Sequence, residues 1–333
     1  MSVVADPTAL PTGAIVEGRM AFQVARNGSL IMTSRGHGML LDQQRNLSRD
    51  RIVAGDTAAN ILIDGDSSSV AEANGNVHVF GKNQVGGLVE YRFNRAANTW
   101  STNVFAFTDV LAGEPTAFID EQGRVEALIN RHDGHLLLYR SDSPTPIDLT
   151  GLVGGPDVFT SVAIVENKDT DTLFAYGADQ TGGVVEYAFT TTTPTLTNMN
   201  VRGNTITTPG QTGRDTKVFQ SLNAVLAGGT RHIFGTDGHS RLVHLEITNP
   251  AALSAITASA ENATELTKVA ATGYFDTFRQ GVKQVNGQDL QQEFAARVYP
   301  ELSVLVDPAD GNLFVYGTND LDLVEFTRTG KRL

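Results

Sequence analysis

The sequence predicts an all-β protein, a six-bladed β-propeller with four antiparallel strands in each blade. Three observations indicate this fold. A pattern of apolar strand, short polar loop and second apolar strand occurs six times, recurring about every 48 residues through most of the 333-residue chain. Residues suited to tight hairpin turns connect the strands. Further strand-like runs precede and follow these pairs, and four antiparallel strands repeated radially describe propeller blades.

The strand pairs set the expected number of blades. They span residues 31–43, 79–93, 128–140, 175–189, 233–247 and 315–326. The last interval is the longest, so a seven-bladed ring with a degenerate blade between Thr248 and Pro300 stays open as the alternative.

Each pair is extended to four strands by its flanking runs. The first strand of a blade is expected at residues 20–26, 116–121, 161–166, 222–227 and 301–307. Asn27–Gly28, Asn74–Gly75 and Asp310–Gly311 favour type I′ turns after that strand, because both central positions of the turn need positive φ. The fourth strand is expected at residues 100–107, 146–153, 195–201 and 265–270.

The last unit ends after its third strand. Residues 10–18 are similar to residues 148–155, which we predict to be a fourth strand. The N-terminal segment is therefore expected to complete the last blade and close the ring, which removes free sheet edges. The prediction is thus a single domain over residues 1–333, although the length alone would suggest about two domains.

Long connections indicate which face is functional. With the strands named A to D in chain order, the D-to-A and B-to-C connections of a meander fall on one face. The long D-to-A segments are residues 49–67, 202–220 and an insertion at about 272–300. Within that insertion, Leu290, Phe294 and Val298 predict a short amphipathic helix. Loops this long in a compact domain often carry function, although neutral decoration is the alternative.

Candidate ligand-binding residues lie in these two classes of loop. Imidazoles can hydrogen-bond neutral ligands, and aromatic rings can stack on a sugar or simply anchor a loop. The B-to-C loops contain Arg35, His37, His132, Asp133, His135, Asp237 and His239, and the insertion adds Tyr274, Phe275 and Phe278. The histidines come from different blades, so no metal site is predicted. His78, His232 and His244 lie within strands and are expected to be structural.

A glutamate recurs before an aromatic residue in three units, as Glu90, Glu186 and Glu325, and His244 replaces it in the fifth unit. A single catalytic centre would not need a carboxylate in every blade. The recurrence therefore indicates solvated strand positions or contacts between blades.

Composition excludes several functions. The 37 acidic residues outnumber the 25 basic ones, and a net charge of −12 repels nucleic acid and anionic membrane surfaces. The absence of cysteine excludes disulfides, cysteine-ligated metals and thiol nucleophiles. No apolar stretch is long enough for membrane insertion, and with Arg19 as the first basic residue no export signal is recognised.

Catalytic and cofactor motifs are also absent. The sequence has no Gly-x-Ser-x-Gly, His-Glu-x-x-His or phosphate-loop motif. The nearest approach to a calcium loop, at residues 307–312, is explained by a hairpin turn. No cofactor is therefore expected, and calcium is the one candidate left open.

One unit carries a family resemblance. Residues 123–139, GRVEALINRHDGHLLLY, resemble the blades of bacterial propeller lectins, where a strand after Gly leads to a polar Asp-Gly loop and then to an aromatic-bearing strand. The resemblance implies glycan binding. Those lectins typically place a Trp in each blade against the sugar, whereas Trp100 is the only Trp of this chain. One site built from irregular face loops is therefore expected, not six equivalent ones.

The predicted function is a non-catalytic recognition domain that binds a glycan or a protein through this face. Two alternatives stay open. One is a hydrolase or lyase acting on a carbohydrate or lactone, with carboxylates and histidines at the channel mouth. The other is a structural module of a larger extracellular assembly. Secretion or surface display by a bacterium is favoured, with the cytoplasm not excluded, and the oligomeric state is not predicted.

Overall fold

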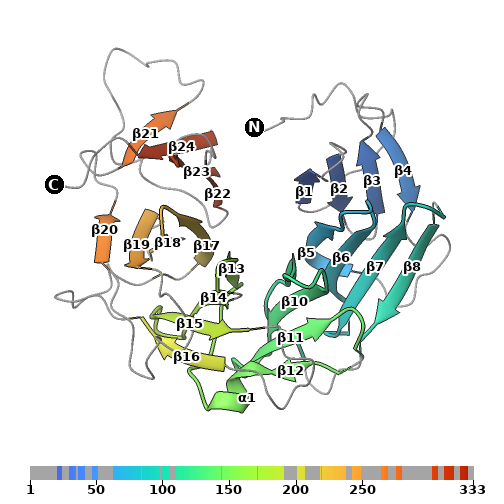
Figure 1. Ribbon diagram of the computed structural model, residues 1–333, viewed down its shortest axis with the longest axis horizontal. Coiled ribbons are helices and arrows are strands. Elements are labelled where there is room, and N and C mark those ends of the chain that lie inside the picture. The colour runs from blue at the N-terminus through green and yellow to red at the C-terminus, as the bar shows by residue number, and fades with distance from the viewer. Residues whose placement is uncertain are drawn as a thin grey trace. The chain divides into compact units, whose positions relative to one another are not determined.

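The computed structural model describes the parts of the chain in which strands and turns are placed. These are residues 21–24, 30–34, 37–41, 47–51, 63–83, 85–97, 99–105, 110–143, 145–170, 172–190, 201–206, 218, 220–237, 242–248, 264–268, 275–279, 302–306, 311–318 and 323–328. Over these ranges the protein is all-β apart from one short helix (Figure 1). The chain divides into two compact units, residues 1–132 with 137–147, and residues 133–136 with 148–333.

The first unit contains two complete four-stranded antiparallel sheets and most of a third. The first sheet has the order β1 (Ala21–Val24), β2 (Leu30–Ser34), β3 (His37–Leu41) and β4 (Leu47–Arg51). The second has the order β5 (Ile63–Ala71), β6 (Val77–Asn83), β7 (Leu88–Asn94) and β8 (Thr99–Val104). The third has the order β12 (Ile147–Asp148), β11 (Leu136–Arg140), β10 (Val125–Asn130) and β9 (Thr116–Ile119).

The second unit contains the helix α1 (Leu149–Val153) and three further sheets. The fourth sheet has the order β13 (Ala163–Asn167), β14 (Thr172–Ala178), β15 (Val184–Phe189) and β16 (Val201–Thr205). The fifth has the order β17 (Gln220–Ala227), β18 (Thr230–Thr236), β19 (Leu242–Thr248) and β20 (Thr264–Lys268). The sixth has the order β21 (Phe275–Arg279), β24 (Leu323–Arg328), β23 (Leu313–Thr318) and β22 (Ser303–Val306).

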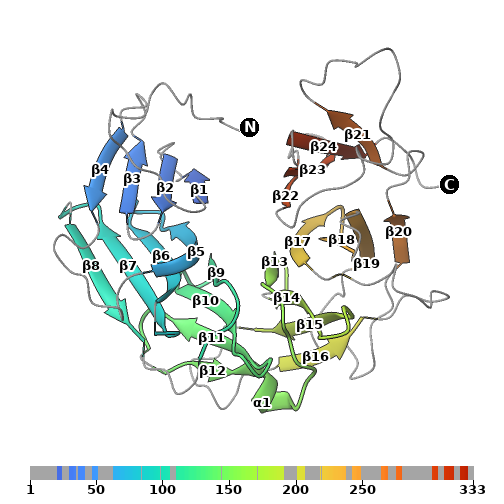
Figure 2. The ribbon, with the colours of Figure 1, turned by 180° about the vertical axis from the view of Figure 1, so that it is seen from behind.

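The described residues thus form six four-stranded sheets, five of which are consecutive meanders (Figures 1 and 2). This agrees with the six predicted repeats, and the glycines expected in two of the A-to-B turns, Gly75 and Gly311, do adopt positive φ. In the part of the chain that the structure describes, no helix is long and apolar enough to cross a membrane.

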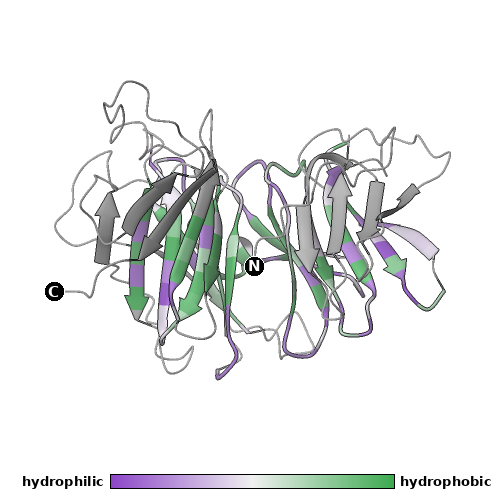
Figure 3. Ribbon diagram, turned by 90° about the horizontal axis from the view of Figure 1, so that it is seen from above, coloured by the Kyte–Doolittle hydropathy of each residue, from purple (hydrophilic) through white to green (hydrophobic). Residues whose placement is uncertain are grey.

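The central strands are buried on both faces because each sheet packs against others. All described residues of β10, β11, β14 and β15 are buried, whereas the outer strand β8 is largely exposed. Apolar residues accordingly concentrate along the strands (Figure 3). In the second unit, Phe174 and Tyr176 of the fourth sheet share one cluster with Ile233 and Val243 of the fifth.

Two of the three recurring glutamates, Glu90 and Glu186, are buried contacts between sheets and are not solvated. Glu90 is fully buried, and Ser141, which follows β11, donates a hydrogen bond to it. Glu186 is 1% exposed and pairs with Arg231 of the fifth sheet. The guanidinium of Arg231 also lies 4.1 Å from the ring centroid of Phe174.

The segment predicted as a fourth strand at residues 146–153 is mostly helical. Only Ile147 and Asp148 are extended, and α1 follows directly. The Asp148 side chain accepts a hydrogen bond from the Gly151 N–H at the start of the helix, and Gly154 ends it in the left-handed conformation. Local capping therefore overrides the strand-like pattern.

The outer position of the sixth sheet is taken by β21, whose residues Phe275 to Arg279 pair antiparallel with Arg328 to Val324 of β24. The N-terminal segment was expected at this position, on the basis of its similarity to residues 148–155. Since residues 149–153 are helical, that similarity does not indicate a strand. Residues 10–18 themselves lie outside the described residues, and the closed single-domain ring stays a prediction.

Candidate functional site

The D-to-A connections lie against the B-to-C turns, as the parity of the meander predicted. In three places a backbone N–H of the connection donates to the carbonyl of a turn glycine with positive φ. The pairs are Leu111 to Gly86 at 2.9 Å, Val158 to Gly134 at 2.7 Å and Val218 to Gly182 at 2.9 Å. Each of these bonds places a D-to-A connection against the B-to-C turn of the sheet before it.

The residue that ends strand B organises the following turn. Asn83 Oδ1 accepts from the Gly87 N–H at 2.7 Å, and Asp179 Oδ1 accepts from the Gly183 N–H at 2.9 Å. Asp237 occupies the same position after β18 and is 4% exposed. Its position and burial match a turn-forming side chain better than the exposed ligand-binding residue we had expected.

His135 forms the polar pair on which the candidate site is built. Its Nδ1 lies 2.7 Å from Oδ2 of Asp148, while the other oxygen of Asp148 accepts from the Gly151 N–H at 2.7 Å. The His135 and Asp148 side chains are 30% and 35% exposed. With Nδ1 engaged by the carboxylate, Nε2 is the ring nitrogen that can meet a ligand.

The first turn of α1 is held from two sides. Thr150 Oγ1 accepts from the Leu136 N–H at 3.0 Å, which fixes the helix to the residue after His135. The Tyr187 hydroxyl lies 2.9 Å from Thr150 Oγ1 and 2.6 Å from the Pro156 carbonyl oxygen. Burial raises the pKa of Tyr187 to about 12, so it stays a neutral donor. The His135–Asp148 pair therefore rests on a fixed support.

An aromatic ring and further carboxylates lie beside this pair. Gly134 has φ +92°, and a Cβ built there would come within 2.6 Å of Asp157 Cβ and 2.7 Å of the Phe159 ring. Phe159 is half-buried and Asp157 is exposed. Asp133 is exposed and its Oδ1 accepts from the His135 N–H at 3.3 Å. We call Asp133, His135, Asp148, Asp157 and Phe159 the α1 site.

Only part of the predicted set contributes to the α1 site. Asp133 and His135 belong to it, while His132 is an exposed turn residue of the first unit. His37 begins β3 opposite Arg51. Phe275 and Phe278 lie in β21, opposite Arg328 and Glu325, and thus in a strand of the predicted insertion. Arg35, His239, Tyr274 and the helix expected at residues 290–298 lie outside the described residues.

Sequence reasoning missed Asp148, Asp157 and Phe159. A signal for Phe159 was present, because Val158–Ser161 and Val218–Ser221 share the pattern V-F-x-S just before a first strand. Asp148 was assigned to a strand, and its capping role became visible only with the helix in place.

Comparison with known proteins supports the fold class. No family model matches the sequence. No curated protein matches it either. Among solved structures, AofleA from Arthrobotrys oligospora is 13% identical with a TM-score of 0.52, over 94% of this chain and 84% of that one. The SapL1 lectin, in complex with α-methyl fucoside, is 14% identical with a TM-score of 0.48, over 94% of both chains.

The neighbours support a β-propeller. At an identity of 13%, the likeness to AofleA bears on the fold alone.

Proposed function

We propose that this protein is a carbohydrate-recognition domain that binds a neutral sugar at the α1 site. The observation that carries the proposal is the His135–Asp148 pair, which is held at 2.7 Å on a fixed support while about a third of each side chain stays exposed. Polar groups that are already positioned lose little conformational entropy when a ligand binds.

The chemistry of the α1 site suits a polyhydroxyl ligand. When His135 donates its Nδ1 proton to Asp148, Nε2 becomes an acceptor for a ligand hydroxyl. The carboxylates of Asp133 and Asp157 add further acceptors, so the site can receive several hydroxyl donors. The half-buried ring of Phe159 offers an apolar contact for the C–H face of a sugar. The name of the SapL1 lectin complex makes α-methyl fucoside a reasonable first probe.

The test is binding of the full chain to a glycan array that includes α-fucosides, with calcium and again with chelator. We expect a specific hit that survives the chelator. Phe159→Ala and His135→Gln should each weaken binding by about tenfold or more, the size of one lost contact of about 1.4 kcal/mol.

Asp169→Asn is the control, because Asp169 is an exposed carboxylate like Asp157 but lies in the A-to-B turn between β13 and β14. It should leave affinity unchanged. A blank array would refute carbohydrate recognition, and a hit that neither α1-site variant weakens would refute the site.

A further inference from the structure

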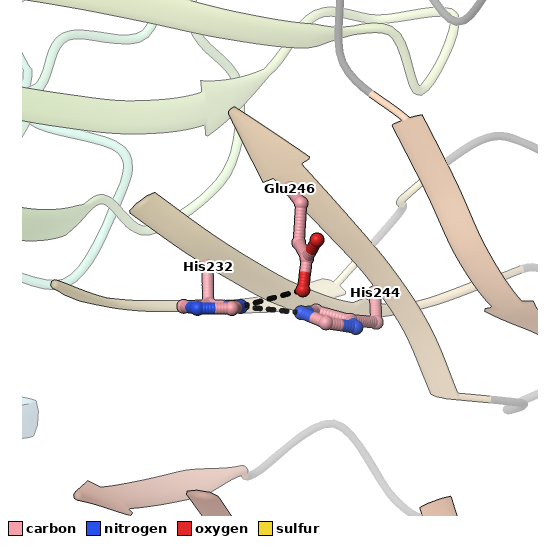
Figure 4. A group of neighbouring side chains, drawn as sticks. All are labelled: His232, His244 and Glu246. Atoms are coloured by element: carbon pink, nitrogen blue, oxygen red, sulfur yellow. Dashed lines mark hydrogen bonds and ion pairs between the residues drawn. The ribbon is translucent and has the colours of Figure 1, made fainter. Parts of the chain in front are cut away.

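Two histidines and a glutamate converge on one face of the fifth sheet (Figure 4). His232 lies on β18 directly opposite Glu246 of β19, and Phe234 lies directly opposite His244. Because side chains alternate along a strand, residues 244 and 246 share a face, and their cross-strand partners share it too. Two neighbouring strands therefore place the side chains of His232, His244 and Glu246 on the same face of the sheet.

The donor atoms of the three residues are close enough to share an ion. His232 Nδ1 lies 3.0 Å from His244 Nε2 and 3.4 Å from Glu246 Oε1. One ligand atom from each residue can be chosen so that all lie within 4.8 Å of one another. Ligands at about 2.0–2.2 Å from a tetrahedral Zn²⁺ are about 3.3–3.5 Å apart, so small side-chain rotations suffice for coordination.

The group is buried and supported by apolar packing. His232, His244 and Glu246 are 2%, 0% and 7% exposed. The Phe234 ring stacks on His244 with centroids 4.4 Å apart and planes 6° apart. Phe234 in turn belongs to an apolar cluster with Leu242 and Leu313. A low-dielectric setting strengthens the attraction between a carboxylate and a cation.

The second sheet shows how the same positions are otherwise filled. In β6 and β7, His78 lies opposite Arg92, and Phe80 lies opposite Glu90. The position of Arg92 corresponds to that of Glu246, and the position of Glu90 to that of His244. The fifth sheet therefore keeps one carboxylate, has no guanidinium at these positions and has one more imidazole. Positive charge within this group can come from a proton on an imidazole or from a metal ion.

We propose that His232, His244 and Glu246 bind one divalent transition-metal ion, with Zn²⁺ as the expected occupant. Two imidazoles and a carboxylate form a donor set that suits transition-metal ions better than Ca²⁺ or Mg²⁺, which prefer oxygen ligands. The ion takes the place of the hydrogen bond between the two imidazoles, whose nitrogens lie 3.0 Å apart, and each imidazole then carries its proton on the other ring nitrogen. It ties β18 to β19, and this role is independent of carbohydrate binding at the α1 site.

The test uses the full chain, stripped of metal with a chelator and titrated with Zn²⁺ at neutral pH. We expect saturable binding of one ion per chain, a rise in Tm and, with Co²⁺ as a probe, visible absorption typical of a tetrahedral site. His232→Gln and Glu246→Gln should each weaken Zn²⁺ binding by about 100-fold or more, since mutation of residues that only support the metal ligands already costs about 10- to 100-fold in affinity.

His78→Gln is the matched control, because His78 takes the place of His232 in the second sheet and is also buried. It should leave Zn²⁺ affinity unchanged. The Tm and Co²⁺ measurements on the unaltered protein need no variant to fold. Absence of saturable Zn²⁺ binding would overturn the proposal, and so would equal affinity in His232→Gln.

Discussion

The buried polar groups of the second and fifth sheets occupy the same register positions but balance charge differently. In the second sheet, Glu90 lies 2.6 Å from His78 and 2.7 Å from Arg92. In the fifth sheet, the carboxylate of Glu246 lies with two imidazoles. The repeat therefore determines where a buried polar group stands, while the residue that compensates its charge differs from one sheet to the next.

The largest loss of stability is expected when a fully buried carboxylate loses the guanidinium that pairs with it. Arg231 is 0% exposed, lies 2.9 Å from the Tyr176 hydroxyl and pairs with Glu186. Arg231→Met removes the arginine from a buried carboxylate and should lower the free energy of unfolding by about 3–5 kcal/mol. Chemical denaturation measures this loss.

Two variants sharpen that experiment. Adding Glu186→Gln to Arg231→Met should restore part of the stability, because the stranded charge is gone. Arg92→Met should cost less, since the Arg92 side chain is 35% exposed and its loss can be compensated by water. If Arg231→Met lowered the free energy of unfolding by less than Arg92→Met, burial of the arginine would not determine the size of the loss.

The third sheet pairs Glu126 with Arg140 at 2.8 Å, and the described residues provide no hydrogen-bond partner for Glu126 Oε2. Burial outweighs the arginine and raises the pKa of Glu126 to about 7 from 4.5. The folded state therefore binds this proton more tightly than the unfolded state, and stability falls as pH rises from about 4.5 to about 7.

Glu126→Gln removes this dependence. The difference in unfolding free energy between the unaltered protein and the variant should change by up to about 3 kcal/mol between pH 4 and pH 8. Denaturant titrations across that range measure it. A difference that stays constant with pH would show that Arg140 keeps Glu126 ionised.

The charge of His78 should contribute less to stability than the proton on Glu126, and its contribution should be lost at a higher pH. Burial opposes charging of His78, but its hydrogen bonds with Glu90 and Glu72 outweigh burial and raise its pKa above 6.5. The stability from this group is fully present below pH 6.5 and is lost as pH rises through the higher folded pKa. His78→Gln should cost about 1–3 kcal/mol near pH 6 and less at alkaline pH. An equal cost at both pH values would exclude a charged His78.

The partly exposed His135–Asp148 pair should contribute least to stability. Asp148→Ala removes the cap of α1 and should cost about 0.5–2 kcal/mol, whereas Asp148→Asn keeps an acceptor for the Gly151 N–H and should cost less. Thermal unfolding distinguishes the two. Equal losses would assign the effect to the pair with His135 and not to the helix cap.

Much of the fold could be predicted from the sequence because its signals are local. Asn74–Gly75 predicts a turn from adjacent residues, and the chain does turn there with positive φ at Gly75. The predicted type I′ placement was wrong, because the Gly75 N–H donates to the Glu72 carbonyl oxygen and Ala73 and Asn74 are therefore the central residues. His135 was found because it follows an Asp-Gly turn. Its partner Asp148 was missed, because the residues after it read as a strand until capping is considered. His232 and His244 were interpreted as structural because they lie within strands, and the linear sequence does not show that they meet Glu246.

The repeating strand pairs, their turns and the shared face of the D-to-A and B-to-C connections can be derived from the sequence, since they follow from the alternation of residues along each strand and the parity of the meander. Three contacts become visible only in the folded chain: β21 completes the sixth sheet, Arg231 reaches Glu186, and His232 and His244 meet Glu246. Strand register and sheet packing set those contacts, and both depend on residues far apart in the chain.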